Sequence, residues 1–447
     1  METEEAREAA EFTLPRSRLA NERLHAMVPG GAHTYAKGDD QYPEDLAPVI
    51  SHGRGAHVWD VDGNRYVEYG SGLRSVSLGH AHPRVIEAVR RELDRGSNFV
   101  RPSVVEVEAA ERFLATVQTA EMVKFAKNGS DVTTAAVRLA RAVTGRTRVA
   151  ICGDHPFYSV DDWFIGTTPM PAGVPAATTD LTVAFPYGDL AATEDLLARY
   201  RGEVACLILE AATHSEPPPG YLAGLRELAD RHGCLLVFDE MITGFRWSEA
   251  GAQGLYGVVP DLSTFGKALG NGCAVSALAG RREVMERGGL RHSGERVFLL
   301  STTHGAETHS LAAAMAVQTT YAEEGVTARL HALGERLAAG VREAAAGMGV
   351  GEHVVVRGRA SNLVFATLDE HGRPSQEYRT LFLRRLLAGG VLAPSFVVSS
   401  ALTDADIDHT VDVVAQACAV YRKALDAGDP APWVAGRPVK PVFRRYV

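Results

Sequence analysis

Residues 237–272 read VFDEMITGFRWSEAGAQGLYGVVPDLSTFGKALGNG and contain two short strand-like runs, each followed by polar side chains. The first run, CLLVFDE, begins just before this stretch at Cys234 and ends at Asp239 and Glu240, and the second, DLSTFGK, ends at Lys267. Short runs of apolar residues are typical of strands that are buried on both faces of a parallel sheet. Because functional groups gather at the carboxyl ends of such strands, we expect Asp239 at the functional edge of the sheet.

Segments before this stretch repeat the alternation of strand and helix. The further predicted strands are EMVKFAKNG (121–129), RVAICG (148–153) and VACLILE (204–210). SDVTTAAVRLARAVTG (130–145) is a predicted helix that Ser130 can cap and Gly145 can end, and LAGLRELADRHG (222–233) is another helical pattern. The alternation predicts an α/β protein whose mainly parallel sheet is covered by helices on both faces.

The order of predicted helices, strands and loops divides the chain into four parts. Residues 1–80 hold a Gly-rich loop and a hairpin, AHVWDVDGNRYVEY, with an Asp-Gly turn between alternating apolar positions. Residues 81–326 form the large domain that contains the sheet. Residues 327–427 begin with a long amphipathic helix and predict a smaller α+β domain, and residues 428–447 predict an extended tail.

The composition excludes several classes of protein. A chain of 447 residues with 46% hydrophobic and 23% charged residues is typical of a soluble protein of two or three domains. No run reaches the roughly 18 apolar residues of a membrane span, and the acidic start lacks the pattern of a secretory signal. The net charge of −9 argues against nucleic-acid binding. Five scattered cysteines predict reduced thiols in the cytoplasm, with neither disulfides nor a metal site.

Lysine usage singles out Lys267. Only six of the 46 basic residues are lysines, and Lys267 is the only one between Lys127 and Lys423. It lies in an apolar, glycine-bordered segment, where an amine can lose its proton and form a Schiff base, chemistry that a guanidinium cannot perform. The alternative is a residual surface lysine.

The run Asn128-Gly129-Ser130 leads directly into the predicted helix, so free amides and a hydroxyl meet the positive end of the helix dipole. These groups form a candidate phosphate-binding site, although ordinary helix capping explains the presence of the same residues. The markers of dinucleotide and P-loop sites do not occur. Pyridoxal 5′-phosphate (PLP) requires an amine, a carboxylate and a phosphate-binding site. Lys267, Asp239 and the start of the predicted helix offer these three groups. A carboxylate satisfied by backbone amides is the alternative for Asp239.

The stretch 237–272 resembles the cofactor-lysine region of class III aminotransferases, and within them the branch typified by glutamate-1-semialdehyde aminomutase. The resemblance extends to AHVWDVDGNRYVEY with GHAHPRV, to KFAKNGSDVTTAAVRLARAVTGR, and to GVLAPS with LTDADID. It covers most of the chain and implies fold type I of the PLP-dependent transferases. By this resemblance Lys267 is the Schiff-base lysine and Asp239 is the partner of the pyridine nitrogen.

The resemblance also implies the remaining cofactor contacts. Gly129 and Ser130 would hold the phosphate, Met241 would pack against the ring, and Glu210 matches the strand-end glutamate of the family. A threonine of the family reaches across a homodimer to the phosphate of the neighbouring subunit, and Thr302 or Thr303 can take that role.

Three loops depart from the family pattern. In place of Tyr-His-Gly the chain has Asp-His-Pro-Phe-Tyr, so we expect the aromatic residue on the ring to be His155 or Phe157. The mutase has an arginine for the substrate carboxylate shortly after its Gly-Gly loop, where this chain offers only Lys37. Around Ser301 the mutase pattern Gly-Thr-x-Ser-Gly-Asn-Pro is replaced by STTHGAETHS.

The altered loops resemble a sub-branch associated with amino-sugar and aminoglycoside assembly, and thus with antibiotic biosynthesis. This implies an aminotransferase that passes an amino group from a small-molecule donor to a keto- or aldehydo-sugar, with Tyr35, Lys37 and Asp162 among the substrate contacts. Solvated loops explain these polar residues equally well. The polar loop residues are His33, Tyr35, Asp39, Asp40, Asp161 and Asp162.

Three rival functions remain open. An aminomutase or epimerase would use the same chemistry at Lys267 without an external amino donor. A decarboxylase needs a clamp for the substrate carboxylate, and no clear arginine stands out for it. A non-enzymatic protein of the same fold is disfavoured because Lys267 and Asp239 are both intact.

Overall fold

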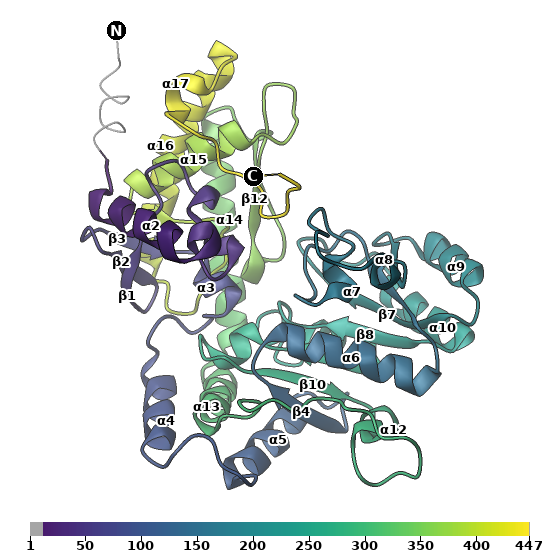
Figure 1. Cartoon of the computed structure of the whole chain (residues 1–447). Coiled ribbons are helices and arrows are strands. Elements are labelled where there is room, and N and C mark those ends of the chain that lie inside the picture. The colour runs from purple at the N-terminus through teal and green to yellow at the C-terminus, as the bar shows by residue number, and fades with distance from the viewer. Residues whose placement is uncertain (1–11, 447) are drawn as a thin grey trace. The chain divides into compact units, whose positions relative to one another are not determined.

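A seven-stranded sheet forms the centre of the larger part of the chain (Figure 1). The computed structural model describes residues 12–446. By its internal contacts the chain divides into two units. Unit 1 holds the chain up to Leu73, Leu78–His82 and Ala328–Arg444, and unit 2 holds Arg74–Ser77, Pro83–Thr327 and the chain from Arg445 on.

The sheet of unit 2 has the strand order β4-β10-β9-β8-β7-β5-β6. The strands are β4 Met122–Ala126, β5 Arg148–Cys152, β6 Thr182–Phe185, β7 Val204–Glu210, β8 Leu235–Asp239, β9 Leu262–Phe265 and β10 Ser276–Gly280. Strands β5 to β9 run parallel, whereas β10 is antiparallel to both of its neighbours. The predicted α/β class with a mainly parallel sheet is therefore confirmed.

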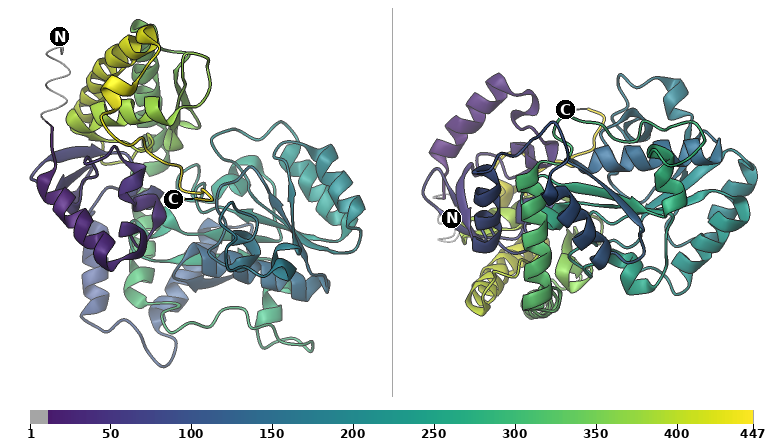
Figure 2. Two further views of the ribbon diagram at one scale, coloured as in Figure 1. Left: turned by 45° about the horizontal axis from the view of Figure 1, so that its top comes forward. Right: turned by 90° about the horizontal axis from the view of Figure 1, so that it is seen from below.

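Both faces of this sheet are apolar and covered. All seven residues of β7 are buried, with Leu207 packed in one apolar cluster and Ile208 in the other. The cluster on the Ile208 side includes residues of α6 (Gly129–Thr144), and the cluster on the Leu207 side includes residues of α10 (Tyr221–His232). Each fully buried aliphatic side chain contributes about 1.5–3 kcal/mol, so the two helix layers fix the sheet from both sides (Figures 1 and 2).

Helix α6 begins one residue earlier than predicted, and its N-cap is Asn128 and not Ser130. The Asp131 carboxylate accepts a hydrogen bond of 2.9 Å from the Asn128 backbone N–H, which closes the first turn. Ser130 consequently lies inside the first turn, where its hydroxyl oxygen accepts a hydrogen bond of 3.1 Å from the Val160 N–H. The helix ends at Gly145, in the left-handed conformation, as predicted.

The other elements of unit 2 surround the sheet or connect its strands. They are α4 Pro83–Leu93, α5 Val104–Thr116, α7 Asp162–Ile165, α8 Ala176–Thr179, α9 Leu190–Arg199, α11 Gly251–Tyr256, η4 Lys267–Gly270, α12 Arg282–Met285, η5 Glu286–Gly288 and α13 Thr308–Glu324. No helix in residues 12–446 combines the length and the apolar character that a membrane crossing requires.

Unit 1 contains a four-stranded sheet that joins the two ends of the chain. The predicted hairpin forms from β2 and β3, and the turn glycine Gly63 has a φ of 97°. Strand β13, from the C-terminal part, pairs in parallel with β3. The strands of unit 1 are β1 Ile50–Arg54, β2 His57–Asp60, β3 Arg65–Glu68 and β13 Val391–Leu392, with β11 Val354–Arg357 and β12 Val364–Thr367 as a separate pair.

The helices of unit 1 follow the predicted order. Helix α14 begins at the end of unit 2 and continues into unit 1. The chain after residue 427 includes one helical turn, α17, and then packs on unit 1, because the Val439 N–H donates to Thr380 Oγ1 at 2.9 Å. The helices are α2 Pro15–Met27, η1 Pro29–Gly31, η2 Tyr35–Lys37, η3 Asp39–Gln41, α3 Ser71–Arg74, α14 Val326–Gly347, η6 Ala360–Asn362, α15 Gln376–Ala388, α16 Asp404–Ala427 and α17 Ala431–Val434.

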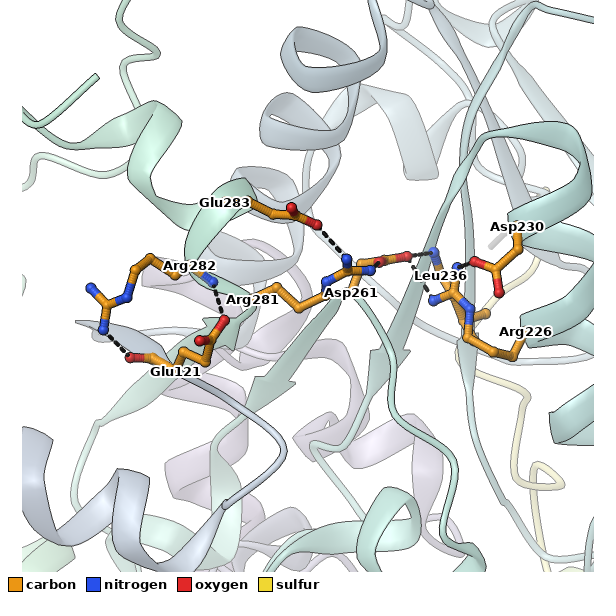
Figure 3. A network of polar contacts seen from close by, with 8 residues as sticks. All are labelled: Glu121, Arg226, Asp230, Leu236, Asp261, Arg281, Arg282 and Glu283. Carbon is orange, nitrogen blue, oxygen red and sulfur yellow. Dashed lines mark hydrogen bonds and ion pairs between the residues drawn. The ribbon is translucent and has the colours of Figure 1, made fainter. Parts of the chain in front are cut away.

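At the amino end of β9, Asp261 ties four elements of unit 2 together (Figure 3). Its carboxylate, 2% exposed, accepts hydrogen bonds from Arg226 Nη1 of α10 at 2.8 Å and from Arg281 Nη1, after β10, at 2.7 Å. The Leu236 backbone N–H of β8 donates to the same carboxylate at 2.7 Å. A buried carboxylate needs such partners, and here they align the starts of adjacent strands.

We predict that Asp261→Asn lowers the free energy of unfolding by about 3 kcal/mol, because it removes the buried charge that pairs with two arginines and replaces one acceptor oxygen with an NH2 donor. Denaturant-induced unfolding of the purified protein measures the loss. Glu283→Gln is the matched control, since Glu283 also pairs with Arg281 but is 67% exposed. It should change stability by no more than about 0.5 kcal/mol. Equal effects of the two variants would contradict the role of Asp261.

Candidate active site

The carboxyl ends of the three central strands bring three polar side chains into one row. In the register of the sheet, Glu210 at the end of β7 lies opposite Asp239 at the end of β8. Asp239 in turn lies opposite Thr264 of β9, and Lys267 follows Thr264 by three residues. The strand ends that the sequence predicts to carry functional groups therefore meet at one edge.

Asp239 is 4% exposed and has two neutral hydrogen-bond donors. The Met241 backbone N–H and Thr264 Oγ1 donate to Asp239 Oδ1 at 3.0 and 3.2 Å. Burial raises the pKa of Asp239, and the charge of Lys267 and these hydrogen bonds oppose that shift. The carboxylate thus depends on a nearby cation as well as on backbone and hydroxyl donors, so an added cationic group at this edge would be stabilised.

Lys267 is half-buried and has a left-handed backbone, with a φ of 46°. Burial lowers the pKa of its amine, while the carboxylates of Asp239 and Glu210 raise it and the charges of Arg74 and Arg246 lower it further. Its position beside buried carboxylates differs from that of a residual surface lysine. A lowered pKa increases the unprotonated fraction, which is the nucleophilic form of the amine.

Glu210 is 8% exposed, and its pKa is raised to about 8 by burial and by the charge of Asp239. Lys267 and Arg74 only partly offset these effects. The side chain is therefore mostly protonated at neutral pH. It can donate a hydrogen bond where an ionised carboxylate could only accept one.

The amino end of α6 lies next to the same edge, through Met241. A methyl group added at Gly129 would lie 3.2 Å from Met241 Sδ, and one added at Gly266, beside Lys267, would lie 2.7 Å from the same atom. Both positions therefore need glycine or a shift of Met241. The first amides of α6 lack acceptors within the helix, and Ser130 still has its hydroxyl proton to donate after accepting from Val160.

Of the two predicted ring-stacking residues, His155 is buried and Phe157 is 42% exposed. Phe157 packs edge-on against Phe164. The Glu210 backbone N–H donates to His155 Nδ1 at 3.1 Å, so Nδ1 carries no proton and Nε2 carries it. Burial lowers the pKa of His155 to about 4, which keeps the ring neutral. His155 Nε2 is buried and has no hydrogen-bond partner among residues 12–446, as a ligand-facing group would.

The remaining predicted site residues lie in exposed loops. Thr302 and Thr303 are exposed in the loop before α13, and Asp162 is exposed at the start of α7. Tyr35 and Lys37 belong to unit 1, where both are exposed in η2.

Several of the predicted substrate-binding acids are engaged within the chain. Asp39 pairs with His25 at 3.0 Å and Asp40 with Arg444 at 2.6 Å. Asp161 accepts a hydrogen bond of 3.0 Å from Ser159 Oγ. Each of these three carboxylates therefore contributes to the structure of the chain.

Arg74 and Arg246 are site residues that the sequence did not indicate. Arg246 is fully buried, and its Nη2 donates to the Arg74 carbonyl oxygen at 2.8 Å. Burial lowers the pKa of Arg246 to about 10. The four non-glycine residues of unit 2 with left-handed φ in the described chain are Arg74, Phe245, Lys267 and Asn271, with φ of 68°, 54°, 46° and 43°. Each costs about 1–3 kcal/mol, and such costs are concentrated at functional sites.

These residues fit PLP. A half-buried amine and a buried carboxylate share one edge, free helix amides adjoin it, two glycines leave room beside Met241, and a buried imidazole N–H lacks a partner. PLP needs an amine for its aldehyde, an anion for its ring nitrogen and donors for its phosphate.

Comparison with known proteins gives an independent result. The family model for "Aminotransferase class-III" matches residues 39–417. A glutamate-1-semialdehyde 2,1-aminomutase from Desulfitobacterium hafniense (strain DSM 10664 / DCB-2) is 34% identical over 425 residues, which cover 90% of this chain and 97% of that protein.

Solved structures of other proteins share the fold of this chain. An omega-transaminase from Sphaerobacter thermophilus is 26% identical with a TM-score of 0.80, over 90% of this chain and 97% of that one. The FumI protein of Sphingopyxis sp. MTA144, solved in its PLP internal aldimine form, is 24% identical with a TM-score of 0.85, over 94% of this chain and all of that one. Fold type I, which the sequence resemblance implies, is confirmed.

We predict that Glu210→Gln changes how stability depends on pH. The folded protein retains the Glu210 proton up to about pH 8, whereas the unfolded chain releases it near the ordinary pKa of 4.5. The wild type should therefore lose stability relative to the variant as the pH rises from about 4.5 to about 8. Thermal unfolding midpoints across this range measure the effect, with the exposed-site variant Glu283→Gln as control. If the unfolding midpoints of wild type and Glu210→Gln changed with pH in parallel, the raised pKa of Glu210 would be refuted.

Proposed function

This chain belongs to the class III aminotransferase family, and we propose that it transfers amino groups between small molecules with PLP held at Lys267. The observation that carries the proposal is the row of Lys267, Asp239 and Glu210 at the strand edge beside the amino end of α6. PLP is the cofactor of such enzymes, and every group that it requires has a candidate in this row or next to it.

Bound PLP withdraws electrons from the substrate carbon that carries the amino group, which makes the proton on that carbon acidic. Lys267 Nζ, whose pKa is lowered by burial, can take up this proton and return it at another atom. The Asp239 carboxylate favours a protonated ring nitrogen, and Gly129 and Ser130 supply donors to the phosphate. His155, in its neutral form with the proton on Nε2, can cover the ring or donate to it.

We propose a sugar-like aldehyde or ketone as the acceptor in an aminotransferase reaction of two half-reactions. Exposed polar side chains at Asp162, in unit 2, and at Tyr35 and Lys37, in unit 1, support a polar, hydroxylated substrate. In the sequence, Lys37 lies near the place where the mutase pattern has an arginine. Asp39, Asp40 and Asp161 are engaged in contacts within the chain, so the proposal does not rely on them.

An aminomutase is the second candidate. It is favoured by the relative of 34% identity, which is named as a glutamate-1-semialdehyde 2,1-aminomutase and is matched over 97% of its length. A mutase moves an amino group within one substrate and needs no external donor. The same Lys267 would act in either case, so dependence on a donor separates the two.

We further propose that the working unit is a homodimer in which Thr302 or Thr303 serves the neighbouring site. Unit 2 carries exposed apolar side chains on and before α5, which a second copy would cover. These side chains are Leu93, Phe99, Val100, Val104 and Val107.

We predict that borohydride reduction of the PLP-loaded protein fixes the pyridoxyl group to Lys267. The visible absorption of the bound cofactor should disappear, and peptide mapping should find the label on the peptide that contains Lys267. Lys267→Ala should bind PLP without fixation and show no turnover. A label on any other lysine would reassign the cofactor lysine.

We predict that amino donors alone convert the PLP-loaded protein to the pyridoxamine phosphate form, and that candidate keto- or aldehydo-sugars reverse the change. Absorption spectra of mixtures with single donors and single acceptors follow both half-reactions. Turnover of an amino-aldehyde to its isomer without any donor would establish the aminomutase instead. No spectral change with any amine would contradict both functions.

A further inference from the structure

The loop that carries Thr302 and Thr303 is tied to the sheet by an ion pair. Lys127 Nζ, just after β4, lies 2.7 Å from Oε2 of Glu307, the N-cap residue of α13. His304 Nδ1 lies 3.1 Å from the other oxygen, Oε1. The Glu307 side chain is 12% exposed, and the hydrogen bond from Lys127 holds its pKa below the ordinary value. Glu307 is therefore ionised at neutral pH, with both oxygens occupied.

The two partners belong to segments that are themselves fixed. On one side, Ser276 Oγ of β10 donates to the carbonyl oxygen of Asn128, the residue after Lys127, at 2.8 Å. On the other side, the Thr308 N–H donates to the Ser97 carbonyl oxygen at 3.0 Å, which holds the start of α13. The ion pair thus joins the start of α13, where the loop ends, to the segment that continues directly into Gly129 and Ser130.

The loop that ends at Glu307 has little internal support. Within residues 301–306 of the described chain, the backbone makes one turn hydrogen bond, from the Gly305 N–H to the Thr302 carbonyl oxygen at 3.3 Å. Gly305 approaches the β4 backbone, since a methyl group added there would lie 4.0 Å from the Phe125 carbonyl oxygen. The side chain of Glu307, which pairs with His304 of this loop and with Lys127, therefore ties the loop to the segment that follows β4.

We propose that Lys127 and Glu307 are positioning residues, whose ion pair holds the 301–307 loop so that the Thr302 and Thr303 hydroxyls can bind the phosphate group of PLP. This inference rests on the proposed function. It adds the residues that position the Thr302 and Thr303 hydroxyls. Neither charge needs to touch the phosphate. Loss of either partner breaks the contact between the loop and the segment after β4, so both losses should weaken the same interaction.

The direction in which Glu307→Gln changes the binding of PLP separates this positioning role from a simple effect of charge. If the two side chains acted only through their fields, Lys127→Met would weaken binding of an anionic phosphate and Glu307→Gln would strengthen it. If they act through the loop, both substitutions weaken it. Pyridoxal, which lacks the phosphate, reports any change in the rest of the site.

The experiment measures the dissociation constants of PLP and of pyridoxal for the wild type and for both single variants. We expect both Lys127→Met and Glu307→Gln to lower the preference for PLP over pyridoxal by about fivefold, the size expected for one partly exposed ion pair. The exchanged pair, Lys127→Glu with Glu307→Lys, should restore most of the preference. Lys124→Met, on the same strand and exposed, should leave it unchanged. An increased preference in Glu307→Gln would overturn the inference.

A double-mutant cycle tests whether the ion pair acts through the threonines. In a Thr302→Val, Thr303→Val background, Lys127→Met and Glu307→Gln should have no further effect on the preference for PLP. A persistent fivefold loss in that background would show that the pair acts elsewhere. Failure of the wild type to bind either ligand would instead overturn the proposed function, and the inference with it.

Discussion

Burial of charge at the ends of β7 and β8 is the constraint on which the rest of the site depends. Asp239 and Glu210 lie side by side on adjacent strands, so ionising both would be costly. Burial and the charge of Asp239 keep Glu210 mostly protonated, while Lys267 and neutral donors support Asp239. The apolar layers on both faces of the sheet maintain this environment. The reactivity of Lys267 is therefore a property of the whole sheet.

The strain in unit 2 follows from the same constraint. Lys267 must approach the carboxylates from the end of β9, and its backbone adopts a left-handed conformation to do so. Phe245 and Arg74 adopt similar conformations where Arg246, which follows Phe245, donates to the Arg74 carbonyl oxygen. Packing of fully buried residues compensates these local costs, as it does for most strained backbone at functional sites.

The sequence predicted what depends on local pattern. The strands, α6, the hairpin and the edge that carries Asp239 all follow from short runs of residues and their caps. It did not predict what depends on long-range contacts, such as the role of Arg246, the pairing of β13 with β3, or the Asp261 cluster. The partners of Asp39 and Asp40, which are His25 and Arg444, likewise lie in other segments that no local pattern reveals.

The pairing of β13 with β3 has a consequence for how the chain folds during synthesis. Residues 83–327 are continuous and can form their sheet as soon as they leave the ribosome. Strand β3 emerges early, but its parallel neighbour comes from the last part of the chain. Until then one edge of the β2–β3 hairpin is open to other chains. Unit 1 is thus the last to be completed, and the exposed edge of β3 can pair with other chains until it is.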